Sequence, residues 1–285
     1  MLRALSSGVS GIQQFQNRLD VIGNNIANSN TVAFKAARTD FADAFSQTLQ
    51  VSSASSSGSN QAGMQVGSGV ITAAVKNIFT QGALNRTGVG TDLAIDGDGF
   101  FVVRDPVSLT EYATRAGDFR LDSSGYLTTN KGMRVQGYIT GLANRGDIQV
   151  DAQFAPATTD PLATMTTFSI ARDGSVKVHM SDGTEYQRGV IQLQRFTDPQ
   201  ALLKEGDNLF SGIAAAGPLG GASPVPANPG TNGLGNIESS ALELSNVDLA
   251  NEFANLISTQ RGFQASARII TVSDEILQEL VNLKR

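Results

Sequence analysis

The chain has 285 residues, enough for one large hydrophobic core or two modest ones. Its net charge of −5, with no basic run longer than Lys284-Arg285, excludes a nucleic-acid-binding surface, which needs a stripe of Lys and Arg to neutralise phosphates. The absence of cysteine excludes disulfides and thiolate chemistry, and no stretch reaches the roughly 18 apolar residues that membrane insertion requires.

Apolar residues from Leu2 to about Asn28 recur at steps of three and four, which predicts an amphipathic helix. The opposite face carries Ser, Gln, Asn and Gly and few charges, although an isolated soluble helix normally exposes a charged face. Packing among identical chains is therefore favoured over packing inside one monomer. Four of the apolar residues repeat every seven positions, the coiled-coil interval, and form the predicted N-terminal half of an assembly interface: Leu5, Ile12, Leu19 and Ile26.

The middle of the chain has short β-branched runs separated by Gly, Asp and Asn, a pattern typical of antiparallel hairpins. Turns are predicted at Asp96-Gly97-Asp98-Gly99, Asp122 to Gly125, Arg172 to Gly174 and Ser181 to Gly183. We expect this β region to fold without the terminal helices, because it holds all the predicted strands and is large enough for its own core.

The C-terminal segment predicts a second, longer helix without proline, beginning near a capping pair formed by Ser245 and Asp248. The two helices are expected to lie antiparallel. The apolar residues of this C-terminal helix also repeat every seven positions and complete the predicted assembly interface: Leu249, Leu256, Phe263, Ile270 and Leu277.

These elements predict an α+β fold in which paired, coiled-coil-like terminal helices flank a mainly antiparallel β domain. The expected division is an N-terminal helix with its following motif at 1–45, a flexible Ser/Gly-rich connector at 46–68, a β-rich region at 69–236 and the C-terminal helix at 237–285.

No catalytic, cofactor or metal site is predicted. His179 is the only histidine, and a strand-surface position is more probable for it than a catalytic one. The segment Asp96 to Phe100 lacks the third ligand and distal Glu of a calcium loop, and the Gly-rich stretches lack the Lys-Ser/Thr ending of a phosphate loop.

Three segments of the sequence resemble the axial proteins of the bacterial flagellar rod and hook. They are Leu19 to Asn28 followed by Phe34-Lys35, Asp92 to Phe101 followed by Tyr112 to Phe119, and Ser245 to Leu249 followed by Thr259 to Gln264. The resemblance covers both ends and the first half of the middle, and it is loose from about Gly141 to Asn236.

Within that family, three segments resemble hook members more than distal rod members: Phe41-Ala42-Asp43, Phe196-Thr197-Asp198-Pro199 and the final Asp274 to Arg285. The insert Ser52 to Gly63 points to the distal rod. The expectation is a structural subunit of the hook, with the distal rod as the alternative. A rival from another class is a secreted β-rich carbohydrate-active protein with oligomerisation helices, but the chain has no Trp and only 4 Tyr for a sugar platform.

The resemblance implies a non-enzymatic homopolymer without cofactors, located in the hook-basal body. Its implied partners are flagellar rod, hook-cap and hook-filament junction proteins and the flagellar type III export apparatus. Export without a cleaved signal peptide agrees with the N-terminus, which lacks the apolar stretch of a secretory signal.

Overall fold

The computed structural model describes residues 2–52, 62–139, 145–151, 163–218 and 227–283. The chain divides into two compact units. A helical unit comprises residues 1–29, 36–78 and 247–285, and a β unit comprises residues 30–35 and 79–246. Terminal helices that pack together, with mainly antiparallel strands between them in the sequence, confirm the predicted α+β class.

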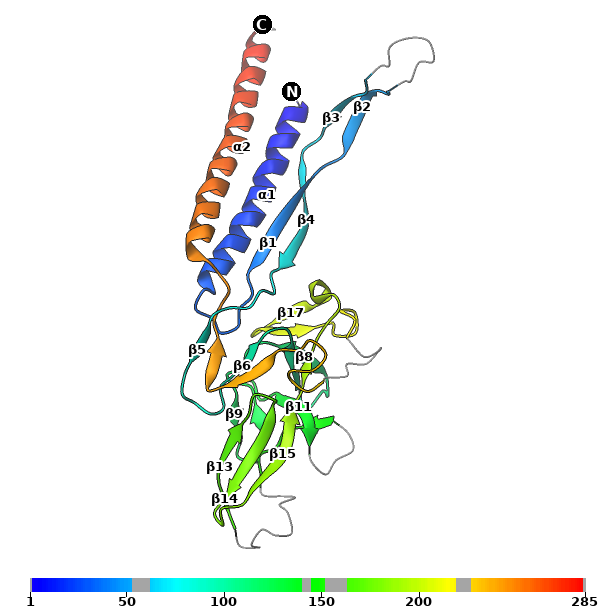
Figure 1. Ribbon diagram of the computed structural model, residues 1–285. Coiled ribbons are helices and arrows are strands. Elements are labelled where there is room, and N and C mark those ends of the chain that lie inside the picture. The colour runs from blue at the N-terminus through cyan, green and yellow to red at the C-terminus, as the bar shows by residue number, and fades with distance from the viewer. Residues whose placement is uncertain (1, 53–61, 140–144, 152–162, 219–226, 284–285) are drawn as a thin grey trace. The chain divides into compact units, whose positions relative to one another are not determined.

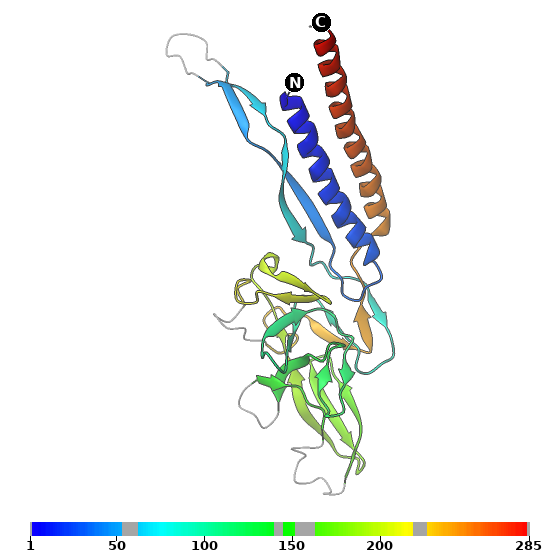
Figure 2. The same cartoon turned by 180° about the vertical axis from the view of Figure 1, so that it is seen from behind.

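The helical unit is built on helices α1 (Leu2–Ala27) and α2 (Leu249–Leu283), which lie side by side in Figures 1 and 2. They run antiparallel, since Gly8 of α1 lies against Ile270 of α2 while Asn25 bonds Glu252. The cap of α2 is Asp248 alone, whose carboxylate accepts from the backbone N–H groups of Ala250 and Asn251. The predicted capping pair with Ser245 is therefore wrong, because the helix starts one residue after Asp248.

A long hairpin accompanies α1 in the helical unit (Figure 1). Strands β1 (Ala37–Asp43) and β4 (Val70–Asn77) pair antiparallel with a register shift at Asp40/Phe41, and β2 (Ser46–Gln50) pairs with β3 (Met64–Gly67). The predicted connector at 46–68 thus carries β2 and β3 on its flanks, and its Ser-rich centre at 53–61 lies outside the described residues.

The β unit consists of short antiparallel strands. Twelve strands of the described part form one sheet whose main path is β13-β14-β15-β11-β7-β8-β18-β17, and two further pairs, β19-β6 and β20-β5, bring the C-terminal strands back to the first ones. The bounds are β5 Leu84–Arg86, β6 Leu93–Asp96, β7 Phe100–Arg104, β8 Glu111–Thr114, β9 Arg120–Leu121, β10 Leu127–Thr128, β11 Arg134–Ile139, β12 Arg145–Asp147, β13 Met165–Ile170, β14 Ser175–Met180, β15 Glu185–Ile191, β16 Leu193–Gln194, β17 Leu203–Gly206, β18 Leu209–Ser211, β19 Asn236–Ser239 and β20 Ala241–Glu243, with a 3-10 turn at Pro199–Ala201.

The predicted turns lie between these strands. Gly97, Gly99, Gly125, Gly174 and Gly183 all have positive φ, the backbone region in which glycine carries no Cβ penalty. Each turn therefore falls where the sequence pattern placed it.

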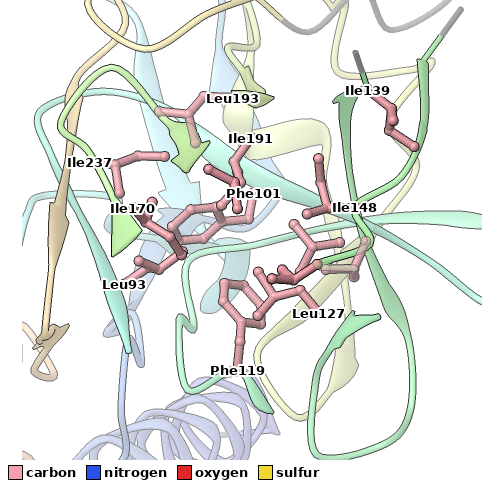
Figure 3. Close-up of a cluster of buried hydrophobic side chains, with 14 of the residues drawn as sticks. Leu93, Phe101, Phe119, Leu127, Ile139, Ile148, Ile170, Ile191, Leu193 and Ile237 are labelled. Atoms are coloured by element: carbon pink, nitrogen blue, oxygen red, sulfur yellow. The ribbon is translucent and has the colours of Figure 1, made fainter. Parts of the chain in front are cut away.

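Two hydrophobic clusters fill the β unit. The larger one is drawn in Figure 3 and includes Phe101, Leu127 and Ile191, each fully buried. The smaller one is aromatic: Phe100 meets Phe79, Phe196 and Phe210 edge to face at centroid separations of 5.4 to 6.1 Å.

The segment at 30–35 belongs to the β unit, and its last three residues, 33–35, are buried. Ala33 donates its backbone N–H to the carbonyl of Glu243 at 2.8 Å, and Lys204 lies 3.8 Å from the centre of the Phe34 ring. Asn208 donates its side-chain amide to the Val32 carbonyl at 2.6 Å.

A buried ion cluster closes the β unit. Lys35 Nζ donates to Glu243 Oε1 at 2.6 Å, and both side chains are 0% exposed. Arg115 Nη1 lies 3.4 Å from Glu243 Oε2 with its side chain 3% exposed. Glu243 also accepts the backbone N–H of Gly82, and Lys35 donates to the Thr80 carbonyl, so the buried charges are hydrogen-bonded as well as paired.

Burial lowers the pKa of Lys35, and the charge of Glu243 acts against this fall. The ammonium thus relies on one carboxylate for its charged form inside the protein. Removing that carboxylate leaves two buried cations without a counter-charge.

We predict that the self-sufficient β fragment is 30–246 rather than the 69–236 expected from the sequence pattern. The shorter fragment lacks Lys35, Glu243, most of β19 and all of β20. Circular dichroism should show cooperative thermal unfolding for 30–246 and a broad, non-cooperative transition for 69–236. A sharp transition in the shorter fragment would contradict the role given to the ion cluster.

Glu243→Gln in the 30–246 fragment should lower the free energy of unfolding by about 3–5 kcal/mol, because it strands Lys35 and Arg115 as buried charges. The control is Glu185→Gln, whose carboxylate is 57% exposed and pairs with His179; it should cost less than about 1 kcal/mol. Urea unfolding measures both. Equal losses of unfolding free energy in the two variants would show that burial of the ion cluster does not determine its contribution to stability.

Candidate assembly surface

Small residues line the closest contact between α1 and α2. Thr259, Ser266 and Ser273 follow one another at every seventh position and are the buried residues of α2. Gly11 faces them from α1, where an added Cβ would lie 3.0 Å from Ser266 Oγ. Small side chains let two helix backbones approach closely, so Gly, Ser and Thr form the centre of the seam, and Ile270 packs beside Gly8 and Phe15 beside Gly262.

The residues predicted as an assembly interface border this seam. Leu5, Ile12, Leu19 and Ile26 of α1 are half-buried, as are Leu256, Phe263 and Ile270 of α2, while Leu249 is 42% and Leu277 37% exposed. The structure brings the two sets onto facing helices. Their part in contacts between subunits stays a prediction.

Helix α2 also exposes large apolar side chains, although one of them, Ile269, lies beside Gly8 of α1. These residues were not predicted from the sequence, because the prediction used only one seven-residue repeat. In a single chain these side chains face water, and surfaces of this kind mark contacts with other proteins: Phe253, Ile257, Ile269, Val272, Ile276, Leu280, Val281 and Leu283.

Asn25 fixes the hairpin to the helices. Its side-chain amide donates to the Ala37 carbonyl at 2.8 Å and its side-chain oxygen accepts the Ala37 N–H at 3.0 Å, while the amide also reaches Glu252 of α2 at 3.3 Å. One buried residue of the predicted motif thus holds three elements. The motif carried this signal, since an Asn on the apolar side of a helix needs such partners.

A groove of about 340 Å³ separates α1 from the hairpin, with Phe15, Phe41 and Val70 among its lining residues. Phe15 and Phe41 meet edge to face at 6.1 Å, and the Arg18 guanidinium lies 5.8 Å from the Phe41 ring centre. The hairpin itself exposes Phe45, Leu49, Val51, Met64, Val66, Ile71 and Val75.

The candidate chemical residues do not form a catalytic site. Ser169 Oγ lies 3.1 Å from His179 Nε2, and His179 Nδ1 lies 3.0 Å from Glu185, but Ser169 and Glu185 are exposed on β13 and β15, the strands on either side of β14. Catalysis by such a set needs an oxyanion hole and a site that excludes water. Across the described ranges, no group of three or more His, Cys, Asp or Glu residues could hold a metal ion.

No helix in the described part of the chain combines the length and apolar character needed to cross a bilayer.

Three family models match the chain. They are the flagellar hook protein FlgE/F/G D1 domain at residues 94–178, the flagellar basal body rod FlgEFG protein C-terminal at 238–283 and the flagella basal body rod protein at 5–35. Their matches fall on the three segments that carried the resemblance in the sequence.

Full-length relatives agree with these matches. The chain is 43% identical to the flagellar basal-body rod protein FlgG of Bacillus subtilis over 288 residues, covering 100% of both chains, and 35% identical to that of Caulobacter vibrioides, covering 99% of this chain and 100% of the relative. It is 27% identical to the flagellar hook protein FlgE of Borreliella burgdorferi over an alignment of 450 residues that covers 100% of both.

We predict opposite effects of adding a side chain at two helix glycines. A Cβ at Gly262 would lie 2.7 Å from Phe15 Cζ, whereas one at Gly23 would meet nothing within 4 Å. Gly262→Gln should therefore destabilise the helical unit by about 1–3 kcal/mol through overpacking, and Gly23→Gln should stabilise it by up to about 1 kcal/mol through helix propensity.

The loss of helical circular dichroism on heating the full chain measures both changes. If both variants melted at the same temperature, the close approach of α1 and α2 at the seam would be wrong.

Proposed function

The chain belongs to the family of flagellar basal-body rod and hook proteins, structural subunits that polymerise in the flagellar basal body, and on that premise we propose that it is a subunit of the distal rod. The proposal is supported above all by length. The rod proteins align end to end with this chain over 288 and 287 residues, close to its own length. The alignment with the hook protein needs 450 positions to cover both chains. A hook protein of that alignment carries extra segments that this chain lacks.

One of the sequence features that favoured the hook has a local structural explanation. Phe196 is buried in the aromatic cluster, Asp198 accepts the Gln200 N–H, and Pro199 begins the 3-10 turn. Asp before the turn and Pro at its first position are residues that such a turn favours in any protein. These residues therefore do not separate hook from rod, and the hook remains the second candidate because of its alignment over both full chains.

Assembly in this proposal uses the apolar residues that α2 and the hairpin leave exposed. Burying a Leu or Ile side chain contributes roughly 1.5–3 kcal/mol before entropy, and a head-to-tail contact that does not close generates a helical polymer. The exposed face of α1 is polar and almost uncharged, with Gln13, Gln16 and Asn17 in the open. Such a face would offer little electrostatic attraction to chains passing through an axial channel.

The proposal places the protein in the hook-basal body, exported through the flagellar type III apparatus. Adjacent rod, hook-cap and junction proteins are its expected partners. A carbohydrate-active role gains no support from the sites described above.

Leu277→Asp should abolish tube formation by the purified full chain, because it places an unpaired charge on an apolar contact surface. The matched control is Gln264→Asp, which puts the same charge on an exposed polar position of the same helix and should leave assembly intact. Negative-stain electron microscopy reads the result. Tubes of normal length from Leu277→Asp would remove Leu277 from the assembly surface.

The morphology of cells that lack the gene distinguishes rod from hook. Truncated rods, together with straight tubes from the pure protein, are the expected outcome for a distal rod subunit. Complete rods without hooks, and curved tubes, would assign the chain to the hook and leave its structural class unchanged.

A further inference from the structure

The β unit contains a pocket that neither the fold nor the helical assembly surface uses. It has a volume of about 300 Å³ and lies where four loops meet, contributed by Thr31, Asp118, Asn130 and Asp207 with their neighbours. Lys131 and Asp207 form an ion pair at this pocket, and both side chains are more than half exposed. The pocket therefore has a solvent-accessible polar rim.

Asp118 is the half-buried charged group of this pocket. Its carboxylate accepts a hydrogen bond from the Asn130 side-chain amide at 2.6 Å, and its backbone forms a bridge with Asp92. Burial raises the pKa of Asp118, and the nearby charge of Asp92 raises it further. The carboxylate is thus held in a place that disfavours its charged form.

Two other half-buried carboxylates of the β unit have cationic partners, whereas Asp92 and Asp105 are held by hydroxyl or backbone donors. Asp147 pairs with Arg104 and Arg134, and Asp151 pairs with Arg188. Among the described residues, no Lys or Arg lies within ion-pair distance of Asp118, and the nearby Lys131 is paired with Asp207. The pocket therefore presents an uncompensated negative charge beside an open volume.

From this arrangement we propose that the pocket receives a basic side chain of a second copy of this chain, with Asp118 as its counter-ion and Asn130 positioning the carboxylate. A guanidinium or ammonium group would relieve both the burial of Asp118 and its repulsion by Asp92. A volume of about 300 Å³ accommodates the end of one Arg or Lys side chain.

The occupant is a second copy because the chain supplies candidate cations of its own. Arg120 and Lys177 are exposed and form no ion pair with another described residue. The assignment rests on the proposed polymerisation, since it places a β-unit contact between neighbouring subunits.

The test uses the full-length chain and the variant Asp118→Asn. Asn keeps an acceptor for Asn130 but removes the charge, so the monomer should melt at the same temperature as the wild type or higher. The critical concentration for polymerisation, measured by sedimentation, should rise at least fivefold. Replacing a residue with a purely structural role would lower the melting temperature as well as weaken assembly.

The matched control is Asp122→Asn, an exposed carboxylate on the neighbouring turn that is not among the residues lining the pocket; it should polymerise as the wild type does. An unchanged critical concentration for Asp118→Asn, or an equal rise in the control, would overturn the proposal.

A direct binding measurement tests the pocket even if the wild type itself fails to polymerise. Such a failure would count against the proposed function and not against the pocket. Methylguanidinium chloride, titrated into the isotope-labelled full chain at constant ionic strength, should shift the NMR signals of Asn130 and Lys131 saturably. The shifts should be absent in Asp118→Asn. Equal shifts in both proteins, or saturable shifts with magnesium chloride instead, would contradict a site for a basic side chain.

Discussion

The fold of the β unit depends on the charge balance around Glu243. This carboxylate lies without exposure between Lys35 and Arg115, which are 208 and 128 residues away in the sequence. Buried charges are tolerated only when paired and hydrogen-bonded. The cluster therefore forces the chain to enter and leave the β unit at one place, where Ala33 donates to the Glu243 carbonyl. The helices that precede and follow this unit in the sequence can therefore pair with each other.

The way those helices pair decides what remains for assembly. A seam of Gly11, Gly262 and Ser266 brings the backbones close, and Phe15 and Ile270 pack beside it. Large side chains such as Phe253, Ile276 and Leu280 are left exposed. A chain that used its Leu and Ile residues for its own helix pair would have less to offer a neighbour. The small-residue seam thus separates the contact within a subunit from the surface available between subunits.

The same separation appears in the hairpin. Asn25 and Phe15 hold its base on α1, and apolar side chains such as Phe45 remain in water. This arrangement suits a structural subunit that acts by packing. A surface with few charges also limits electrostatic repulsion between identical copies.

The sequence by itself determined both helices, the antiparallel β class, the glycine turns and the family, because helical periodicity, turn chemistry and the motifs around Asn25 and Gly97 are local signals. Only the tertiary structure decided the rest. Strand β1 was missed because its polar residues gain strand pairing from β4, more than 25 positions later. The seven-residue repeat found the correct helices, but Gly11 and Ser266 became the close contact because backbone approach depends on what faces each residue. Glu243 carried no signal in the sequence, since nothing local reveals that Lys35 and Arg115 will be buried beside it.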